Sequence, residues 1–183
     1  MKLRSNVLRG KKVFFTSDEH YGHKNIIKFC NRPYDSVDEM NQDIIDKFNS
    51  VVPSNGLTIH AGDFLLGKSV KSQDIISSLA GRHIFIKGSH DKWSDGASHH
   101  EIIELTIDKQ PIIICHYAMR VWARSHYNSW HLYGHSHGGL PPEGKSWDIG
   151  VDSNDFYPLS YDDIKTIMKD RPDNFNLVKP RRY

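Results

Sequence analysis

The sequence has 183 residues, of which 38% are hydrophobic and 25% charged, and its formal net charge is +2. These values are typical of a globular protein that buries a core, and we expect one domain over residues 1–183. No apolar run approaches the roughly 20 residues that a membrane-spanning helix needs, and no apolar signal-peptide core follows the basic start. We therefore expect a cytoplasmic protein with no membrane contact. The cysteines, Cys30 and Cys115, are too few for a disulfide framework.

The first half of the chain alternates between strand and helix patterns. Residues 12–16 form an apolar run typical of a buried strand. Ser36 opens a capping-box pattern, and apolar residues follow it at helical spacing as far as Phe48. Further strands are expected over residues 57–60 and 83–86, with a helix over residues 70–79 that is stopped by Gly81.

The second half changes to closely spaced strands. Apolar runs over residues 102–107 and 111–115 flank a polar Asp-Lys-Gln segment, which predicts a hairpin. Residues 130–133 and 147–151 are expected to form two more strands before a closing helix that Ser160 caps. Since strands and helices alternate first and antiparallel strands are expected to follow, we predict a layered α/β or α+β fold with two sheets or one mixed sheet.

Polar side chains follow five of the expected strands at the point where each strand ends. In α/β sheets, functional sites form in the crevice at the carboxyl ends of the strands. A single histidine there would usually be structural, but five strand ends that all carry carboxylate or imidazole are hard to assign to core packing. The side chains are those of Asp18, His20, Asp63, His90, His116, His135 and His137.

This mixture of aspartate and histidine suits a pair of metal ions. Each ion needs several nitrogen or oxygen ligands, and one carboxylate can bridge two ions about 3.5–4 Å apart. A set without cysteine favours manganese, iron or zinc in a reactive site over a structural zinc. Asp18 and His20 alternate along the chain, so they can converge on one ion only if the strand has ended in a turn before them.

The order of these motifs resembles that of the calcineurin-like metallophosphoesterases, whose blocks are D-x-H, G-D, G-N-H-D, H and G-H-x-H. Here the blocks read Asp18-Glu19-His20, Gly62-Asp63, Gly88-Ser89-His90-Asp91, His116 and Gly134-His135-Ser136-His137, and the match spans residues 12–152. The resemblance implies a two-sheet β-sandwich flanked by helices. It also implies a hydrolase that acts on a phosphodiester or a phosphomonoester.

The resemblance further implies a role for each matched residue. Asp18, His20 and His137 would hold the first metal, Asp63 would bridge both, and Ser89, His116 and His135 would hold the second. His90 would face the substrate phosphate and protonate the leaving oxygen, while a hydroxide that bridges the two ions attacks phosphorus in line. Both cofactors would be divalent ions, with manganese expected and iron, zinc or nickel as alternatives.

The sequence departs from the family pattern at two positions. Ser89 stands where the family usually has asparagine, and a serine hydroxyl reaches less far than an amide carbonyl, so the second metal site is expected to be weaker. Many members also carry an aspartate that orients the catalytic histidine, and Leu66 occupies that position here.

Two more residues are candidates for substrate binding. His23 could line the phosphate pocket or be an ordinary surface histidine or helix cap. Arg32 could clamp a phosphate through two hydrogen bonds, although most arginines are solvated. The segment that contains Trp122, Tyr127 and Trp130 could be a flap that stacks a base or a loop packed on the core.

The expected partner is a phosphate ester, with nucleotides and nucleic acids among the candidates. Because 183 residues leave little room for a large capping domain, we expect an open cleft, which favours a diester. One alternative is a family member whose catalysis Ser89 has weakened. Another is a nucleic-acid-binding module that uses the basic ends of the chain. Those ends carry Lys2, Arg4, Arg9, Lys11 and Lys12 on one side and Lys179, Arg181 and Arg182 on the other.

Overall fold

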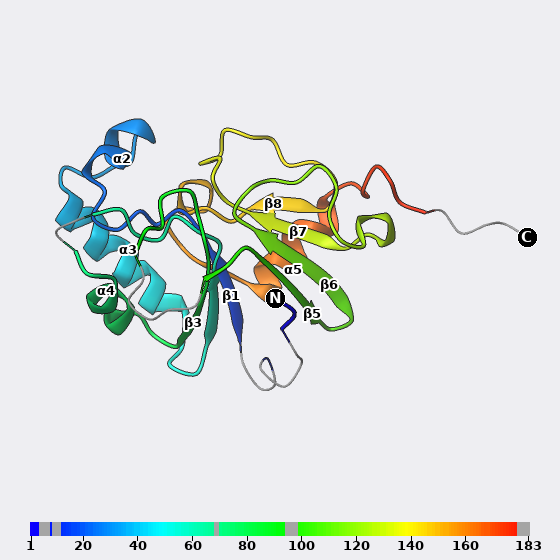
Figure 1. The fold of residues 1–183 in the computed structure, drawn as a ribbon, viewed down its shortest axis with the longest axis horizontal. Helices are drawn as coiled ribbons and strands as arrows, with labels where there is room; N and C mark the ends of the chain where they lie inside the picture. Colours follow the sequence, from blue (N-terminus) through cyan, green and yellow to red (C-terminus); the bar gives the residue numbers. More distant parts are fainter. Residues whose placement is uncertain (4–7, 9–11, 68–69, 94–98, 179–183) are drawn as a thin grey trace, which may run out of the picture.

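Two sheets lie between helices in the computed structural model, which describes residues 1–3, 8, 12–67, 70–93 and 99–178 (Figure 1). The first sheet has the strand order β4-β3-β2-β1-β9 and the second has the order β5-β6-β7-β8. Both sheets are mixed, so the predicted layered α/β class with two sheets is confirmed.

The first sheet is built from the alternating half of the chain and one late strand. Its strands β1 to β4 run parallel, and β9 pairs with β1 in the opposite direction. The strands are β1 (Val13–Thr16), β2 (Leu57–His60), β3 (Arg82–Ile86), β4 (His99–His100) and β9 (Leu159–Ser160). The helices between them are α2 (Lys24–Phe29), α3 (Val37–Val51) and α4 (Ser72–Ser78).

The second sheet corrects the expectation of an antiparallel second half. Only β5 (Ile102–Ile107) and β6 (Gln110–Cys115) pair antiparallel among its strands. β6 pairs parallel with β7 (Trp130–Tyr133), and β7 pairs parallel with β8 (Ser146–Asp148). The reason is that the long connections over residues 116–129 and 134–145 cross back before each new strand begins. The carboxyl ends of β6 and β7 therefore lie at the same edge of the sheet.

Each side of β1 contributes to a different core. Phe14 packs with α3, α4 and their neighbours, while Val13 and Phe15 pack with β5, β6, β7 and α5 (Tyr161–Asp170). Figure 1 shows α2, α3 and α4 together on one side of the first sheet, with α5 on the other side of β1, behind β6 and β7. This alternation fits a strand that is buried on both faces.

Local signals in the sequence explain most element boundaries. The Ser36 side chain accepts a hydrogen bond from the Glu39 N–H, as expected of a cap, but the Glu39 carboxylate accepts from Asp35 instead of Ser36. Ser160 and Asp163 form a full capping box at the start of α5. The hairpin turn consists of two residues, Asp108 and Lys109, which both have positive φ. Gln110 therefore belongs to β6 and not to the turn.

Two expected elements are shorter than predicted. The helix expected over residues 70–79 begins at Ser72 and ends at Ser78, and Gly81, with φ of +93°, turns the chain toward β3 instead of capping the helix. The strand expected over residues 147–151 ends at Asp148, and Val151–Ser153 forms a short 3-10 helix. Among the helices of the described residues, none has the length and apolar character that crossing a membrane would require.

Candidate metal centre

The ends of strands from both sheets meet at one place. After β1, the Asp18 N–H donates to the Gly62 carbonyl and the His20 N–H donates to the Asp63 carbonyl, which joins the loop after β1 to the loop after β2. The His135 N–H then donates to Asp18 Oδ2 over 2.8 Å, which joins the loop after β7 to the same point. A Cβ atom on Gly134 would lie 2.0 Å from Ser17 Oγ and 2.3 Å from Asp18 Oδ2, so glycine permits this close approach.

The backbone at this point is left-handed at most of the expected ligands. Five of them have φ between +45° and +68°: Asp18, His20, Asp63, His135 and His137. Residues other than glycine rarely adopt this conformation, and such strain gathers at functional sites. This conformation also explains how the two outer residues of D-x-H and of H-x-H can point to one place. The strands have ended, so side chains no longer alternate between opposite faces as they do in an extended chain.

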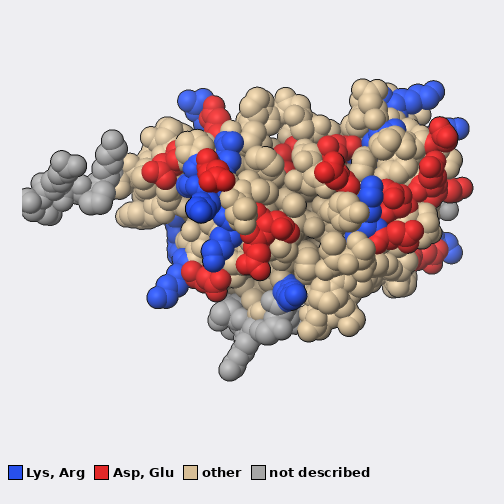
Figure 2. Space-filling model, turned by 180° about the vertical axis from the view of Figure 1, so that it is seen from behind, with Lys and Arg blue, Asp and Glu red and all other residues tan. Residues whose placement is uncertain are grey.

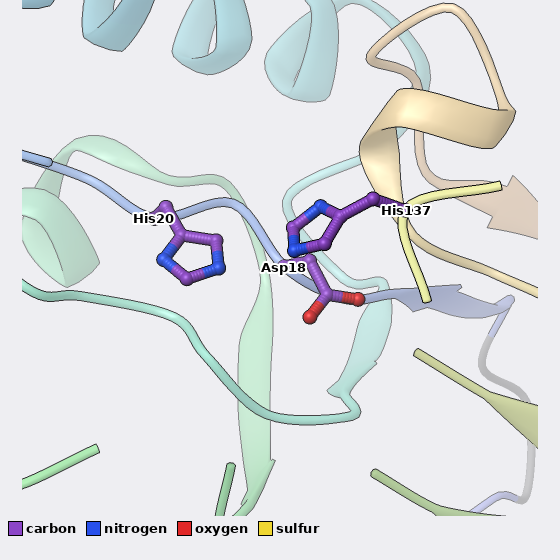
Figure 3. Close-up of side chains that lie close together, drawn as sticks. All are labelled: Asp18, His20 and His137. Atoms are coloured by element: carbon purple, nitrogen blue, oxygen red, sulfur yellow. The ribbon is translucent and has the colours of Figure 1, made fainter. Parts of the chain in front are cut away.

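Two groups of side chains have the spacing of metal ligands. The first is Asp18, His20 and His137, whose ligand atoms all lie within 4.8 Å of one another and which face a common space in Figure 3. The second is Asp63, His116 and His135, with the same limit of 4.8 Å. Asp63 Oδ2 lies between the groups, 3.7 Å from His20 Nε2 and 3.4 Å from His116 Nε2.

Several ligand atoms in these groups are buried and have no hydrogen-bond partner. They are Asp18 Oδ1, His20 Nε2 and His116 Nε2. Burying a polar atom without a partner costs about 1–3 kcal/mol, so three of them in one centre are not expected of a site that stays empty. Nitrogen and carboxylate oxygen atoms are the donor set of catalytic divalent ions. The residues therefore fit such ions.

Hydrogen bonds from outside the centre fix the orientation of two of these histidines. His137 Nδ1 lies 2.7 Å from Asp152 Oδ2, and His116 Nδ1 lies 3.0 Å from the Ala61 carbonyl oxygen. With Nδ1–H as the donor in each case, Nε2 is left with a free lone pair. Ligating histidines in metalloproteins usually make such contacts.

Arg32 forms a buried ion pair with Asp152, so it is neither solvated nor available to bind a phosphate. It is 5% exposed, and its Nε and Nη2 each donate to Asp152 over 2.8 Å. The remaining N–H groups donate to the carbonyl oxygens of Asp18 and Glu19 and to Met40 Sδ. Because all five donors are occupied inside the protein, the expected substrate-binding role of Arg32 is wrong.

Ser89 and His90 lie at the exposed rim. The Ser89 hydroxyl donates to Asp63 Oδ2 over 3.0 Å, so position 89 lies beside the carboxylate between the two groups. The His90 N–H donates to Asp63 Oδ1 over 2.7 Å. The His90 ring is exposed, and its centroid lies 5.6 Å from that of His20 and 6.4 Å from that of His23. His23 is half-buried, and its Nδ1 lies 3.3 Å from His20 Nδ1.

Asp91 closes the loop that carries Ser89 and His90, a function that the sequence did not predict. Its carboxylate accepts hydrogen bonds from the N–H groups of Asp63, Phe64 and Gly88 and from the Trp93 indole. These contacts join the loop after β2 to the loop after β3. The motif that resembles G-N-H-D contains Asp91, but the spacing alone does not show which backbone groups it binds.

Burial and mutual contacts shift the pKa values of the centre. Burial raises the pKa of Asp18 to about 7 and lowers that of His20 to about 3. Burial alone would also raise the pKa of Asp63, but the His116 ring, whose Nε2 lies 3.4 Å away, and a hydrogen bond from the His90 N–H hold it well below its usual range. Without a cation, the burial of Asp18 disfavours its charged form, and a cation at this point would restore it.

Behind the centre lies a buried chain of titratable groups that the sequence did not single out. His60 Nδ1 lies 2.5 Å from Glu19 Oε1, and His60 Nε2 lies 3.0 Å from His83 Nδ1. Burial raises the pKa of Glu19 to about 8 and lowers those of His60 and His83 to about 3. All three groups are therefore expected to be neutral at pH 7. His60 and His83 are structural, as expected of most histidines outside the motifs.

The aromatic segment after β6 packs on the core. Trp122 and Trp130 are buried, and the Trp122 indole donates to the Ser129 carbonyl oxygen. Only Tyr127 of the three aromatic residues named in the flap hypothesis is exposed. The loop interpretation is therefore the one that fits. Both cysteines are free thiols, and Cys30 forms a third close group with His137 and Asp152.

The basic ends of the chain lie mostly outside the described residues. Of their cations, Lys2 and Lys12 are described, and Lys2 Nζ lies 3.8 Å from Glu104 Oε2. Figure 2 shows the side of the molecule opposite to Figure 1, where basic and acidic side chains are interspersed.

Comparisons with known proteins give one relative in sequence and a shared fold in structure. No protein-family model matches the chain. The uncharacterized protein MJ1445 of Methanocaldococcus jannaschii is 30% identical over 168 residues, which cover 87% of this chain and 92% of that protein. The crystal structure of AQ665 from Aquifex aeolicus, a protein of unknown function, matches with a TM-score of 0.69 and 20% identity over 86% of this chain and 100% of that one. Vps29 of Entamoeba histolytica in complex with zinc matches with a TM-score of 0.42 and 18% identity over 69% of this chain and 64% of that one.

Proposed function

The chain belongs to the same family as MJ1445 of Methanocaldococcus jannaschii, and we propose that it is a metal-dependent phosphoesterase. The observation that carries this proposal is the set of three buried, unpartnered ligand atoms, on Asp18, His20 and His116, around the Asp63 carboxylate. A structural role for these side chains would leave no reason for their lone pairs to converge without donors.

The proposal gives each group of ligands one divalent ion. Asp18, His20 and His137 would hold the first ion, Asp63 would contribute to both, and Ser89, His116 and His135 would hold the second. When bound, such ions lower the pKa of a coordinated water and neutralise charge on phosphoryl oxygens. Manganese suits this nitrogen and oxygen set, as do iron and zinc.

The chain's own residues have two tasks in this reaction. Asp152 and the Ala61 carbonyl oxygen hold His137 and His116 so that Nε2 faces the centre. His90 stands exposed at the rim, where its ring can donate a proton to the leaving oxygen of a phosphate bound over the centre. Leu66 is half-buried where the family pattern has an orienting aspartate, so His90 would act without that partner.

The decisive experiment measures metal content and hydrolysis together. We expect the protein loaded with manganese to bind up to two ions and to hydrolyse a chromogenic phosphodiester. Asp63→Ala should lose activity and most of the metal at once, because both groups share this carboxylate. Asp46→Ala, a change at an exposed helix position, is the matched control and should retain both.

Two outcomes would count against the proposal. Full metal content in Asp63→Ala would remove Asp63 from the centre. A wild-type protein that binds two ions but hydrolyses no phosphate ester would favour a family member without catalysis. A third class of function, nucleic-acid binding, would be recognised by binding that needs no metal and weakens steeply with salt.

A further inference from the structure

Tyr117 presents an exposed aromatic ring beside the second group of ligands. Its ring centroid lies 4.9 Å from that of His116 and 4.7 Å from that of His135, with both histidines at edge-on angles. The side chain is 48% exposed, although an aromatic ring would gain from burial. One part of the ring therefore supports the ligands, and the rest is available to a bound molecule.

Phe29 presents a second exposed ring, which reaches the first group of ligands through His23. It ends α2, is 73% exposed, and its centroid lies 6.3 Å from that of His23. The His23 ring in turn lies 5.3 Å from His20 and 6.4 Å from His90. Phe29 thus stands at the rim near His90 and the first group, while Tyr117 stands at the second group.

Isolated exposed aromatic residues are common, and most of them need no explanation. Tyr127 and Phe175 are also exposed, at 69% and 68%, but Tyr127 contacts His126 and Phe175 lies under Arg120. Phe29 and Tyr117 differ because Tyr117 contacts two histidines of the second group, while Phe29 contacts His23, whose ring neighbours His20 of the first group. Exposed Lys28 precedes Phe29 in the sequence, and exposed Arg120 follows Tyr117 by three residues but lies over Phe175.

We propose that Tyr117 and Phe29 stack on the two bases that flank the scissile phosphate, so that the substrate is a phosphodiester between two nucleosides. This inference rests on the proposed phosphoesterase function. Base stacking on exposed aromatic rings, with cations along the backbone, is the usual way in which single-stranded nucleic acids are bound without sequence preference. Tyr117 would take the base on the side of His135, and Phe29 would take the base of the leaving nucleoside on the side of His90.

The test compares a thymidine dinucleotide with analogues that lack one base, the other base, or both. With manganese present, we expect each base to raise kcat/KM by about 5- to 150-fold. Tyr117→Ala should reduce the advantage of one base only, and Phe29→Ala should reduce the advantage of the other. Tyr117→Phe keeps the ring and should keep the advantage, and Tyr127→Ala is the matched control at an exposed tyrosine away from the centre.

Binding of a phosphorothioate dinucleotide, measured by calorimetry, gives a second readout that does not depend on turnover. We expect Tyr117→Ala and Phe29→Ala to weaken binding of this analogue more than binding of its doubly abasic form. If the wild-type protein hydrolyses all four dinucleotides equally well, or if the variants affect all four alike, the inference is wrong while the phosphoesterase function stands. If the metal-loaded protein hydrolyses none of them and no other phosphate ester, both fail.

Discussion

Replacing Asp152 with asparagine should weaken both the fold and the first group of ligands. The carboxylate is 7% exposed, accepts two hydrogen bonds from Arg32 at 2.8 Å and contacts His137 Nδ1 at 2.7 Å. In Asp152→Asn, one oxygen becomes an NH₂ group that faces other donors, and the Arg32 charge remains buried. Breaking a buried ion pair costs about 3–5 kcal/mol. We expect about 3 kcal/mol here, because Arg32 keeps the carbonyl oxygens of Asp18 and Glu19.

The effect on metal binding is measured separately. Loss of the residue that orients a ligating histidine typically reduces metal affinity about 10- to 100-fold. Urea unfolding in a chelating buffer gives the stability change, and calorimetric titration of the folded protein with manganese gives the affinity at each group. Asp46→Asn is the control, since Asp46 only accepts a hydrogen bond from Gln42 on the exposed side of α3.

The two measurements allow the reasoning to fail in two ways. Unchanged manganese affinity together with a loss of stability would show that Asp152 serves the fold alone and that His137 needs no orientation. A stability loss below about 1 kcal/mol would show that the Arg32–Asp152 pair is not held as the structure has it. A loss of affinity at both groups alike would contradict the assignment of His137 to the first group.

Three further predictions address catalysis, the second group and acid stability. His90→Ala should retain metal and lose about 10²–10⁴-fold in rate with poor leaving groups but less with nitrophenol, and an equal loss for both would contradict its role as an acid. Ser89→Asn should raise affinity at the second group and activity at limiting manganese; equal, tight binding of two ions before and after the change would remove position 89 from the ligands. His131 is buried between the Ile113 carbonyl oxygen and the Met119 N–H, and burial lowers its pKa to about 4. The unfolded chain binds this proton below about pH 6.5, whereas the folded protein binds it only near pH 4. The free energy of unfolding should therefore fall by about 3 kcal/mol as the pH drops from about 6.5 toward 4. Urea unfolding over this range should give a shallower pH dependence for His131→Asn than for the wild type, and parallel curves would contradict the assignment.

The fold was predictable where local signals are strong. The capping residues Ser36 and Ser160 begin α3 and α5 as expected, and the apolar runs became β1, β2, β3 and the β5–β6 hairpin. Strand direction in the second sheet was not predictable, because polarity patterns do not say whether a connection returns or crosses over. The connections after Cys115 and Tyr133 are long enough for either.

The convergence of these side chains was predictable because the motifs follow strand ends, and neighbouring strand ends meet in space, while their division into two groups was implied by the family resemblance. The five left-handed ligand residues could not be predicted, since none of them is a glycine. Arg32 was misjudged for a related reason. An arginine in a polar stretch is usually solvated, and its partner Asp152 lies 120 residues away in sequence.

The residues that support the centre could not be predicted from the sequence either, and the reason is physical. A metal ligand must offer a nitrogen or oxygen donor atom at a fixed position, so its residue type and its spacing in the sequence form a motif. A supporting carboxylate such as Asp91 or Asp152 needs only to accept hydrogen bonds, and its donors are backbone N–H groups or a distant arginine. Any of the chain's 22 acidic residues has the right chemistry for that task, and folding alone brings one of them to the donors. Asp152 and Arg32 therefore test the structure of the centre more severely than the motif residues do, because nothing but the three-dimensional arrangement assigns them a role there.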